Sequence, residues 1–355
     1  MIASIGVEIE IECAMNLKSL DFNQLVSELI ESGVSFPTAR EQAVRELFGE
    51  TQAELIKNSN DILGVEYVKG LMSINSDLDV TTIKRTGAKA VAYIWDDTFT
   101  YKQSNKIGYK IYRFFQRKSL KRVAKLTNKF FAISDLTKKE ADEFFGIDSI
   151  ILTKPLYRVP EVDYSNFEMP IKAVYAGNLF IGRDKSLARI IKAAERINND
   201  GIKIKFDIYT STELSDTIKE QLTCDYCEIH AAVPQEEVFE IQRNSDLMLF
   251  VEDIDGPDAR IARLSFSTKI TDYLSSGKCI FAVGYKETAP MQYFINNDVA
   301  VIATDDKEIE EKLSMLVNNP DLLVKYAENA RDVGIRNHNE EKIISTFDNC
   351  IKSVI

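Results

Sequence analysis

Short apolar runs and longer amphipathic segments alternate through the second half of the chain. From about residue 170, the runs IKAVYAG, IKFDIYT, CEIHAAV, DLMLFVE and CIFAVG are separated by segments whose apolar residues recur every three or four positions. Continuous apolar runs are typical of strands buried on both faces, and the intervening spacing indicates helices that cover a sheet. The order predicts βαβ units and therefore an α/β fold with a doubly wound, Rossmann-like parallel sheet.

The first 88 residues have a different pattern, which predicts a mainly helical, acidic segment. Apolar positions at helical spacing occur in FNQLVSELIESG and in TAREQAVRELFG, which end at Gly33 and Gly49. Glycine is preferred just past a helix C-terminus because it adopts left-handed backbone angles without strain. The stretch NDILGVEYVKGLMSI predicts a third helix.

Residues 89 to about 165 combine short strands with a basic helix. The runs KAVAYIW, KFFAIS and SIILTKPL predict three strands, with the helix DLTKKEADEFFG between the last two. We expect Asp135 to cap this helix and Gly146 to follow its end. The changes of pattern divide the chain into residues 1–88, 89–165 and 166–340, followed by a C-terminal helix at 341–355.

Composition limits the classes of function. The 355 residues suffice for two or three domains, and the formal net charge of −11 argues against a general nucleic-acid-binding protein. Cys224 and Cys227 form a CxxC pair without a second pair, so we interpret the five cysteines as free thiols in a reducing cytoplasm. The chain has only two histidines, His230 and His338, which argues against metal catalysis through histidine ligands and against a Ser/His/Asp triad. We expect no bound metal and no other cofactor.

No targeting or membrane-spanning pattern is visible. The N-terminus lacks a basic stretch followed by a long apolar core, and no run approaches the ~20 apolar residues of a membrane span. We therefore expect a cytoplasmic protein.

A basic segment, residues 101–131, interrupts this acidic chain. Lysine or arginine occupies about every third position, no acidic residue occurs, and Tyr109, Tyr112, Phe114 and Phe115 lie among the cations. One interpretation is a helix peripheral to the inner face of a membrane, lying on anionic lipid. Two others stay open: contact with nucleic acid, which the overall charge disfavours, and an ordinary domain helix with its aromatic residues in the core.

Candidate chemistry gathers in SFSTKITDYLSSGKCI, beyond the carboxyl end of the run DLMLFVE, where ligands of doubly wound sheets bind. We expect a helix that Ser267 can cap and Gly277 ends. Free amides, the hydroxyls of Ser267 and Thr268, and the ammonium of Lys269 would suit a diphosphate. Asp272 should face a neutral hydroxyl, such as that of a ribose. We expect a buried face of Ile270, Tyr273 and Leu274. The alternative is a capped helix with a solvated lysine.

Two other loops follow predicted strands. After AVYAG come Gly177, which allows close approach of a ligand, Asn178, and Arg183, whose planar fork could reach a phosphate. After the run CEIHAAV, Val233 and Pro234 could present backbone groups to a base edge. Ordinary turns with surface charges are the alternative in both places. The first loop lacks GxGxxG spacing, which disfavours a nicotinamide dinucleotide.

Several of these motifs together resemble a known family. VYAGNL, the GR at 182–183, the AVP at 232–234, SDLMLFVE and SFSTKITDYLSSGKCI are similar to the nucleotide-binding half of a GT-B glycosyltransferase, near the retaining family 4. Residues 89–160 resemble the end of the acceptor-side domain of that fold. The resemblance implies a nucleotide-sugar donor, such as a uridine diphosphate sugar, bound without a metal.

Carried over by position, the resemblance places the diphosphate on Ser267, Thr268 and Lys269 and the ribose on Asp272. Val233 and Pro234 would border the base, as the last part of this nucleotide site.

The sequence departs from the family at two positions. Leu264 stands where the common pattern has the first carboxylate of an E-x7-E pair, and Cys279 replaces a proline. The sugar and the retaining or inverting outcome therefore stay open. We assign no catalytic residue, since Asp96 and Asp97 are also explained as turn residues.

A second resemblance covers residues 20–88. GVSFPTAREQAV, NDILGVEYVKGL and TTIKRTGA are similar to tRNA(Met) cytidine acetate ligase, which implies ATP binding by Asn60 and Arg85. Asp61 replaces an asparagine of the family, and the histidine motif near the family's N-terminus is absent. We therefore do not expect ligase activity.

The resemblances lead to three hypotheses. The first is a glycosyltransferase that uses a nucleotide-sugar and a glycan or lipid-linked acceptor. The second is a non-catalytic nucleotide-binding protein with a truncated acceptor domain, and the third an ATP-dependent ligase-like protein.

Overall fold

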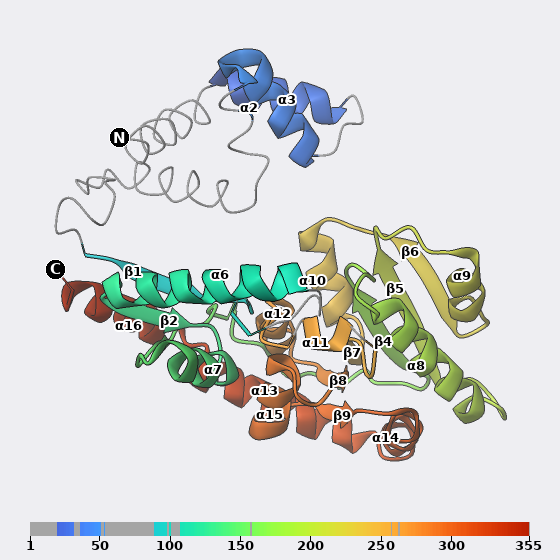
Figure 1. Cartoon of the computed structure of the whole chain (residues 1–355). Coiled ribbons are helices and arrows are strands. Elements are labelled where there is room, and N and C mark those ends of the chain that lie inside the picture. Colours follow the sequence, from blue (N-terminus) through green and yellow to red (C-terminus); the bar gives the residue numbers. More distant parts are fainter. Residues whose placement is uncertain are drawn as a thin grey trace. The chain divides into compact units, whose positions relative to one another are not determined.

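The computed structural model describes residues 20–31, 36–50, 53, 89–97, 99–100, 107–156, 158–256, 258–261 and 263–354. The chain divides into two compact units, residues 1–90 and 91–355 (Figure 1). Four sequence predictions lie outside the described residues: Gly33, Asn60, Arg85 and the helix over NDILGVEYVKGLMSI.

In the first unit, two helices pack against each other: α2 (Leu20–Glu31) and α3 (Phe36–Phe48). The rings of Phe22 and Phe48 lie 6.5 Å apart, and Val26 and Ala43 are buried. Gly49 follows α3 with a φ of 90°, as the pattern predicted. These two helices confirm the helical expectation for the part of this segment that the structure describes.

The second unit contains a six-stranded parallel sheet in the order β6-β5-β4-β7-β8-β9. Its strands are β4 (Ile171–Ala176), β5 (Ile204–Thr210), β6 (Cys227–Ala231), β7 (Leu247–Val251), β8 (Cys279–Val283) and β9 (Val301–Ala303). Helices α8 (Arg183–Ile197), α9 (Asp216–Leu222) and α10 (Gln235–Arg243) connect its first four strands. The fold is α/β and doubly wound, as the alternating pattern predicted.

The central strands of this sheet, β7 and β8, are buried on both faces. Leu247 and Leu249 of β7 belong to a core that includes α8 and α14 (Asp306–Asn318). Met248 and Phe250 belong to a second core formed with α12 (Lys269–Leu274), α13 (Ala289–Asn297) and α15 (Asp321–Asn337). Because alternate side chains of a strand point to opposite faces, two covered faces require the continuous apolar run seen in the sequence.

A smaller parallel sheet has the order β1-β2-β3. Its elements are β1 (Val91–Ile94), α6 (Ile107–Leu126), β2 (Lys129–Ala132), α7 (Asp135–Phe145) and β3 (Ile150–Ile151). The expected cap at Asp135 is wrong: Ser134 has extended backbone angles, and its Oγ accepts from the N–H of Thr137 at 3.2 Å. Asp135 is the first helical residue, where its charge still favours the helix dipole. Gly146 ends α7 with a φ of 70°.

The last helix, α16 (Glu340–Lys352), reaches the smaller sheet, and the ring of Phe347 stacks on Phe131 of β2 at 5.7 Å. The N–H of Leu156 donates to the carbonyl of His338, just before α16, at 2.9 Å. These contacts join the two sheets within one unit (Figure 1). Within the described ranges, no helix is long and apolar enough to cross a membrane.

Candidate functional site

The strand order reverses between β4 and β7, and loops at the carboxyl ends of these strands surround the candidate site. The loop after β4 carries Gly177 and Asn178, and Arg183 begins α8. Glu252 directly follows β7, and Lys269 begins α12. The topology therefore brings residues far apart in the sequence to one edge of the sheet.

Lys269 lies against the end of β4. Its ammonium is 4.6 Å from the ring centroid of Tyr175 and donates to the Tyr175 hydroxyl at 3.4 Å. That hydroxyl donates to the carbonyl of Asn178 at 2.6 Å. Gly177 has a φ of 144°, and a Cβ atom there would overlap Nζ of Lys269. Glycine is therefore needed at this position both for its backbone angles and for the room that the lysine occupies.

The environment of Lys269 disfavours its charge. The pKa of this lysine falls from 10.5 to about 8, mainly because of burial and secondly because of the nearby charge of Arg183, while Glu252 and Asp272 act in the opposite direction. The ammonium has no carboxylate partner within ion-pair distance among the described residues. A cation in this state gains more than an exposed lysine does when an anion arrives.

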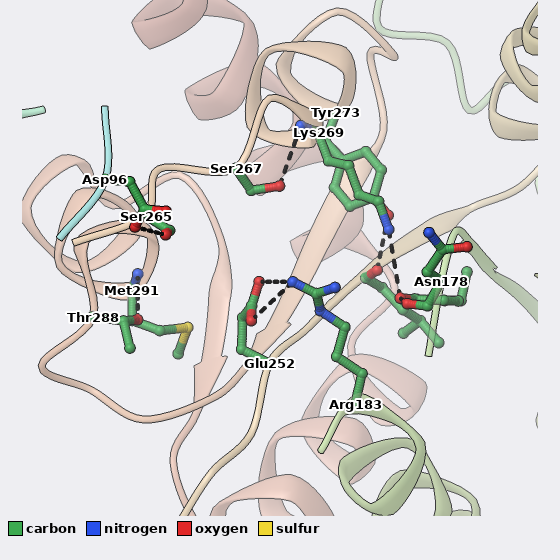
Figure 2. Close-up of polar contacts among 12 residues, drawn as sticks. Asp96, Asn178, Arg183, Glu252, Ser265, Ser267, Lys269, Tyr273, Thr288 and Met291 are labelled. Carbon is green, nitrogen blue, oxygen red and sulfur yellow. Dashed lines mark hydrogen bonds and ion pairs between the residues drawn. The ribbon is translucent and has the colours of Figure 1, made fainter. Parts of the chain in front are cut away.

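Arg183 and Glu252 form an ion pair beside the lysine. Nη2 of Arg183 lies 3.0 and 3.2 Å from the two carboxylate oxygens of Glu252, and Figure 2 shows the two groups facing each other. Burial lowers the pKa of Arg183, but Glu252 more than offsets this and keeps it above its ordinary value. Because only one terminal nitrogen is engaged in this pair, the guanidinium keeps other N–H groups for a ligand.

Glu252 is a site residue that sequence reasoning missed, although an acid directly after the apolar run LMLFV was a usable signal. The next residue, Asp253, is not part of the site. Its carboxylate accepts from the N–H groups of Gly256 and Ala259 at 3.1 and 3.0 Å, which fixes the loop ahead of α11 (Asp258–Ile261), a short helix that the pattern did not predict.

The start of α12 differs in part from expectation. Thr268 occupies the cap position without a side-chain cap bond, while Oγ of Ser267 accepts from the N–H of Lys269 at 3.3 Å (Figure 2). The helix has only six residues, so the ammonium rather than an aligned helix dipole supplies the positive charge. The expected buried face is confirmed at Ile270, Tyr273 and Leu274.

The expected end of α12 at Gly277 is wrong, because Ser275 caps the helix. Gly277 comes two residues later in a left-handed turn with a φ of 73°, and a Cβ atom there would overlap the carbonyl oxygen of Glu161. The turn and this close approach, rather than the helix end, require glycine there.

Asp272 already has a cationic partner. One carboxylate oxygen lies 2.6 Å from Nζ of Lys154, which follows β3 and is half-exposed. Asp272 itself also lines the smaller of the two cavities at the site. The expected neutral hydroxyl partner stays a prediction, and the structure adds Lys154 as a charged partner of Asp272.

Two cavities adjoin at Thr268 and Lys269, which line one each. The smaller, about 280 Å³, is lined by candidates from three loops: Gly177, Asn178, Val233, Lys269 and Asp272. The larger, about 790 Å³, is lined by the remaining polar candidates, Arg183, Ser267 and Thr268, together with Glu252. Pro234 precedes α10 and lines neither cavity.

The two acidic residues after β1 behave differently. The carboxylate of Asp97 accepts from the N–H of Thr100 at 2.7 Å, as a turn aspartate does. Asp96 lines the larger cavity, where Oδ1 accepts from Oγ of Ser265 at 2.6 Å.

One group of metal-ligating side chains lies on neighbouring strands in the part of the chain that the structure describes. Asp207, Glu228 and His230 place ligand atoms within 4.8 Å of one another. Nε2 of His230 is 2.7 Å from Asp207, and its ring stacks on Tyr209 at 4.6 Å. These contacts give His230 a structural role at the surface of the sheet. Cys224 and Cys227 are free thiols.

Two protein families match different parts of the chain. Residues 183–348 match the family described as glycosyl transferase-like, and residues 9–112 match the family described as HIGH nucleotidyl transferase. Both resemblances seen in the sequence are therefore confirmed. The first match contains Arg183, Glu252 and Lys269.

The N-terminal match extends to curated proteins. The tRNA(Met) cytidine acetate ligase of Thermosipho melanesiensis is 41% identical over 70 residues, which cover 19% of this chain and 16% of that protein. The ligase of Clostridium novyi is 39% identical over 77 residues, covering 21% and 19%. The chain thus spans less than a fifth of these relatives.

Solved structures match most of the chain. TarM superposes with a TM-score of 0.55 at 14% identity, covering 80% of this chain and 52% of TarM. The pneumococcal O-GlcNAc transferase GtfA, in complex with UDP and GlcNAc, superposes with a TM-score of 0.51 at 13% sequence identity. The match covers 75% of this chain and 52% of GtfA. A glycosyltransferase from Rickettsia africae superposes with a TM-score of 0.54 at 15% sequence identity, covering 84% of this chain and 82% of that protein. These likenesses show a GT-B-like fold, and the chain spans about half of the first two proteins.

Proposed function

We propose that residues 91–355 bind a nucleotide-sugar and transfer its sugar to a glycan or lipid-linked acceptor. The observation that carries this proposal is the ammonium of Lys269 at the reversal point of the sheet, which is half-buried and has no carboxylate partner among the residues that the structure describes. A donor diphosphate would supply the missing negative charge. The match of residues 183–348 to a glycosyl transferase-like family supports the same conclusion.

The diphosphate would lie where the two cavities adjoin. Lys269 would contact it from one side, Arg183 from the other, and the hydroxyls of Ser267 and Thr268 border the larger cavity. As the bond to the sugar breaks, negative charge grows on the leaving phosphate, and fixed cations stabilise that charge. The proposed transfer therefore needs no metal.

The nucleoside would enter the smaller cavity. Val233 would border the base, and Asp272 would accept from ribose hydroxyls while Lys154 orients its carboxylate. A uridine nucleotide is the first choice, because GtfA was solved with UDP, as was TarM of S. aureus.

Calorimetry with UDP tests the proposal. In Lys269→Ala, the loss of a charged hydrogen bond should weaken UDP binding about ten- to a hundredfold. The matched control is Lys307→Ala, which removes a lysine whose side chain is 84% exposed on α14. Equal UDP affinity in the Lys269 variant and the wild type would refute the assignment.

A second function, nucleotide binding without turnover, is favoured by the small size of the β1-β2-β3 sheet, whose last strand has two residues. Release of UDP from UDP-sugars separates the two: steady turnover supports transfer, and binding without turnover supports the second. The ligase-like alternative rests on the N-terminal match alone, and the residues nominated for it lie outside the described part.

We also propose that α6 lies on anionic lipid, at the inner face of a cytoplasmic membrane. The helix carries seven of the chain's 44 lysines and arginines and none of its 55 acidic residues. Its partly buried side is a stripe at Arg113, Gln116, Leu120 and Ala124. Its outer side exposes apolar groups next to cations: Ile111 is 53% exposed, Phe114 64% and Phe115 60%.

Sedimentation with vesicles tests this surface. The full chain should bind vesicles of phosphatidylglycerol and phosphatidylcholine in equal parts, less so at high salt, and should not bind phosphatidylcholine alone. A double variant, Phe114→Ser and Phe115→Ser, should lose binding, whereas Ile335→Ser on α15 should not. Equal binding to both vesicle types would contradict the proposal.

A further inference from the structure

The larger cavity has one polar and one apolar end. The polar end is formed by Arg183, Glu252, Ser267 and Thr268, which belong to the proposed donor site. The apolar end is lined by side chains from the smaller sheet, from the loop before α12 and from α16: Trp95, Leu152, Phe266, Ile343, Ile344 and Phe347. A cavity of about 790 Å³ therefore continues from the donor site onto an apolar wall.

The apolar wall is exposed although it lies in a concave part of the molecule. Trp95 is 39% exposed, Ile344 53% and Phe347 45%. Concave apolar surface of this kind is typical of ligand sites, because a ligand removes it from water.

Contacts behind the wall fix its side chains. Phe347 stacks on Phe131 at 5.7 Å, and Trp95 lies 5.7 Å from the ring of Tyr93, whose hydroxyl donates to the carbonyl of Leu152 at 2.8 Å. The wall is therefore built before any ligand arrives, so little side-chain ordering is left to oppose binding.

Polar groups mark the boundary between the two ends. Asp96 follows Trp95 and accepts from Ser265 at 2.6 Å, a contact that Figure 2 shows. Thr153 and Lys154 follow Leu152 and line the same cavity. A hydroxyl-bearing head group would thus meet polar partners beside the donor, while an attached hydrocarbon would point along the wall.

The geometry points to an amphipathic acceptor, whose sugar or alcohol head lies at Asp96 and whose hydrocarbon chain packs on Trp95, Ile344 and Phe347. This inference rests on the proposed function, because it takes the polar end as the donor site. It commits the acceptor to the lipid-linked class, since a wholly polar glycan would leave this wall in water.

Trp95 makes the test direct, because it is the only tryptophan of the chain. We would titrate the full chain with butyl, hexyl and octyl glucoside below their micelle concentrations and follow tryptophan emission. Affinity should rise about two- to fourfold per methylene as the chain is buried, with a blue shift of the emission. Free glucose should leave the emission unchanged.

Two variants of one residue separate binding from folding. Phe347→Ala should weaken the binding of octyl glucoside about tenfold and the binding of butyl glucoside much less. Phe347→Leu should restore most of the affinity for octyl glucoside. Val324→Ala on α15 is the matched surface control. All three should keep the wild-type affinity for UDP, which shows that the donor side is intact.

The outcomes separate this inference from the proposed function. If UDP binds through Lys269 but the glucosides show no dependence on chain length, the inference fails and the function stands. The affinity could instead depend on chain length equally in Phe347→Ala and in the wild type, without any change in tryptophan emission. The hydrocarbon would then bind elsewhere, and the inference would also fail. Absence of UDP binding refutes the proposed function itself.

Discussion

Replacing Lys269 by methionine should stabilise the unliganded protein and weaken UDP binding about ten- to a hundredfold. The pKa of Lys269 falls from 10.5 to about 8 in the fold, mainly through burial. At ~1.4 kcal/mol per unit of pKa, keeping this lysine charged at pH 7 costs about 3 kcal/mol of the free energy of unfolding. Methionine avoids this cost but loses the contact with Tyr175, worth ~1 kcal/mol, so the expected net gain is about 2 kcal/mol.

The stability gained in Lys269→Met should depend on pH. Between pH 8 and 10.5 the unfolded chain binds more protons at this lysine than the folded chain does, so wild-type stability rises with pH through this window. Below pH 8 both states are protonated and the full cost remains. The advantage of Lys269→Met should therefore be largest at pH 7 and shrink towards pH 10.

Calorimetry measures both halves of the prediction. Thermal unfolding at pH 7 should show a midpoint about 4–8 °C higher in Lys269→Met than in the wild type, using the relation for domains of this size. If bound UDP restores an ordinary lysine pKa, wild-type titrations should take up about half a proton at pH 8 and about one-tenth at pH 7. A methionine variant that is less stable at pH 7, or that binds UDP as tightly as the wild type, would refute the reasoning.

Three further predictions concern contacts of the candidate site. Gly177→Ala should weaken UDP binding at least tenfold, because its Cβ atom would displace the Lys269 ammonium. The control is Gly146→Ala, at a similarly left-handed position with open space around it. This control should keep the UDP affinity and lose only ~1 kcal/mol of stability. Glu252→Gln should destabilise the fold by about 3 kcal/mol in urea unfolding, because it leaves Arg183 without its buried charge partner. Asp272→Asn should cost more UDP affinity than Lys154→Ala in calorimetry, and the reverse order would remove Asp272 from the ribose role.

Much of the larger sheet follows from hydrophobic pattern alone. Strands β7 and β8 are covered on both faces, so they appear as uninterrupted apolar runs that no surface strand would have. The position of the candidate site also followed, because parallel strands place their carboxyl ends at one edge. Arg183, Lys269 and Gly177 could be nominated from that rule without coordinates.

The partners of those residues could not be predicted in the same way. Lys154 and Asp272 are 118 positions apart, and no local pattern relates a lysine after a short strand to an aspartate in a later helix. Tyr175 belongs to a buried run, and only packing decides that its ring lies under Lys269. Element ends failed for a different reason: Ser134 and Asp135 are both good caps, and the choice between them depends on backbone angles.

His338 shows how the fold connects the two sides of the cleft. Its ring is fully buried, and burial lowers its pKa, so the imidazole is neutral. Nδ1 lies 2.9 Å from the carbonyl of Lys154, which can only accept, so Nδ1 carries the proton and Nε2 accepts from the hydroxyl of Tyr293 at 2.8 Å. The backbone of Lys154 is thus fixed by the residue that ends α15, while its ammonium pairs with Asp272. The residue proposed for the ribose is therefore linked, through Lys154 and His338, to the chain just before α16, the helix that carries part of the apolar wall.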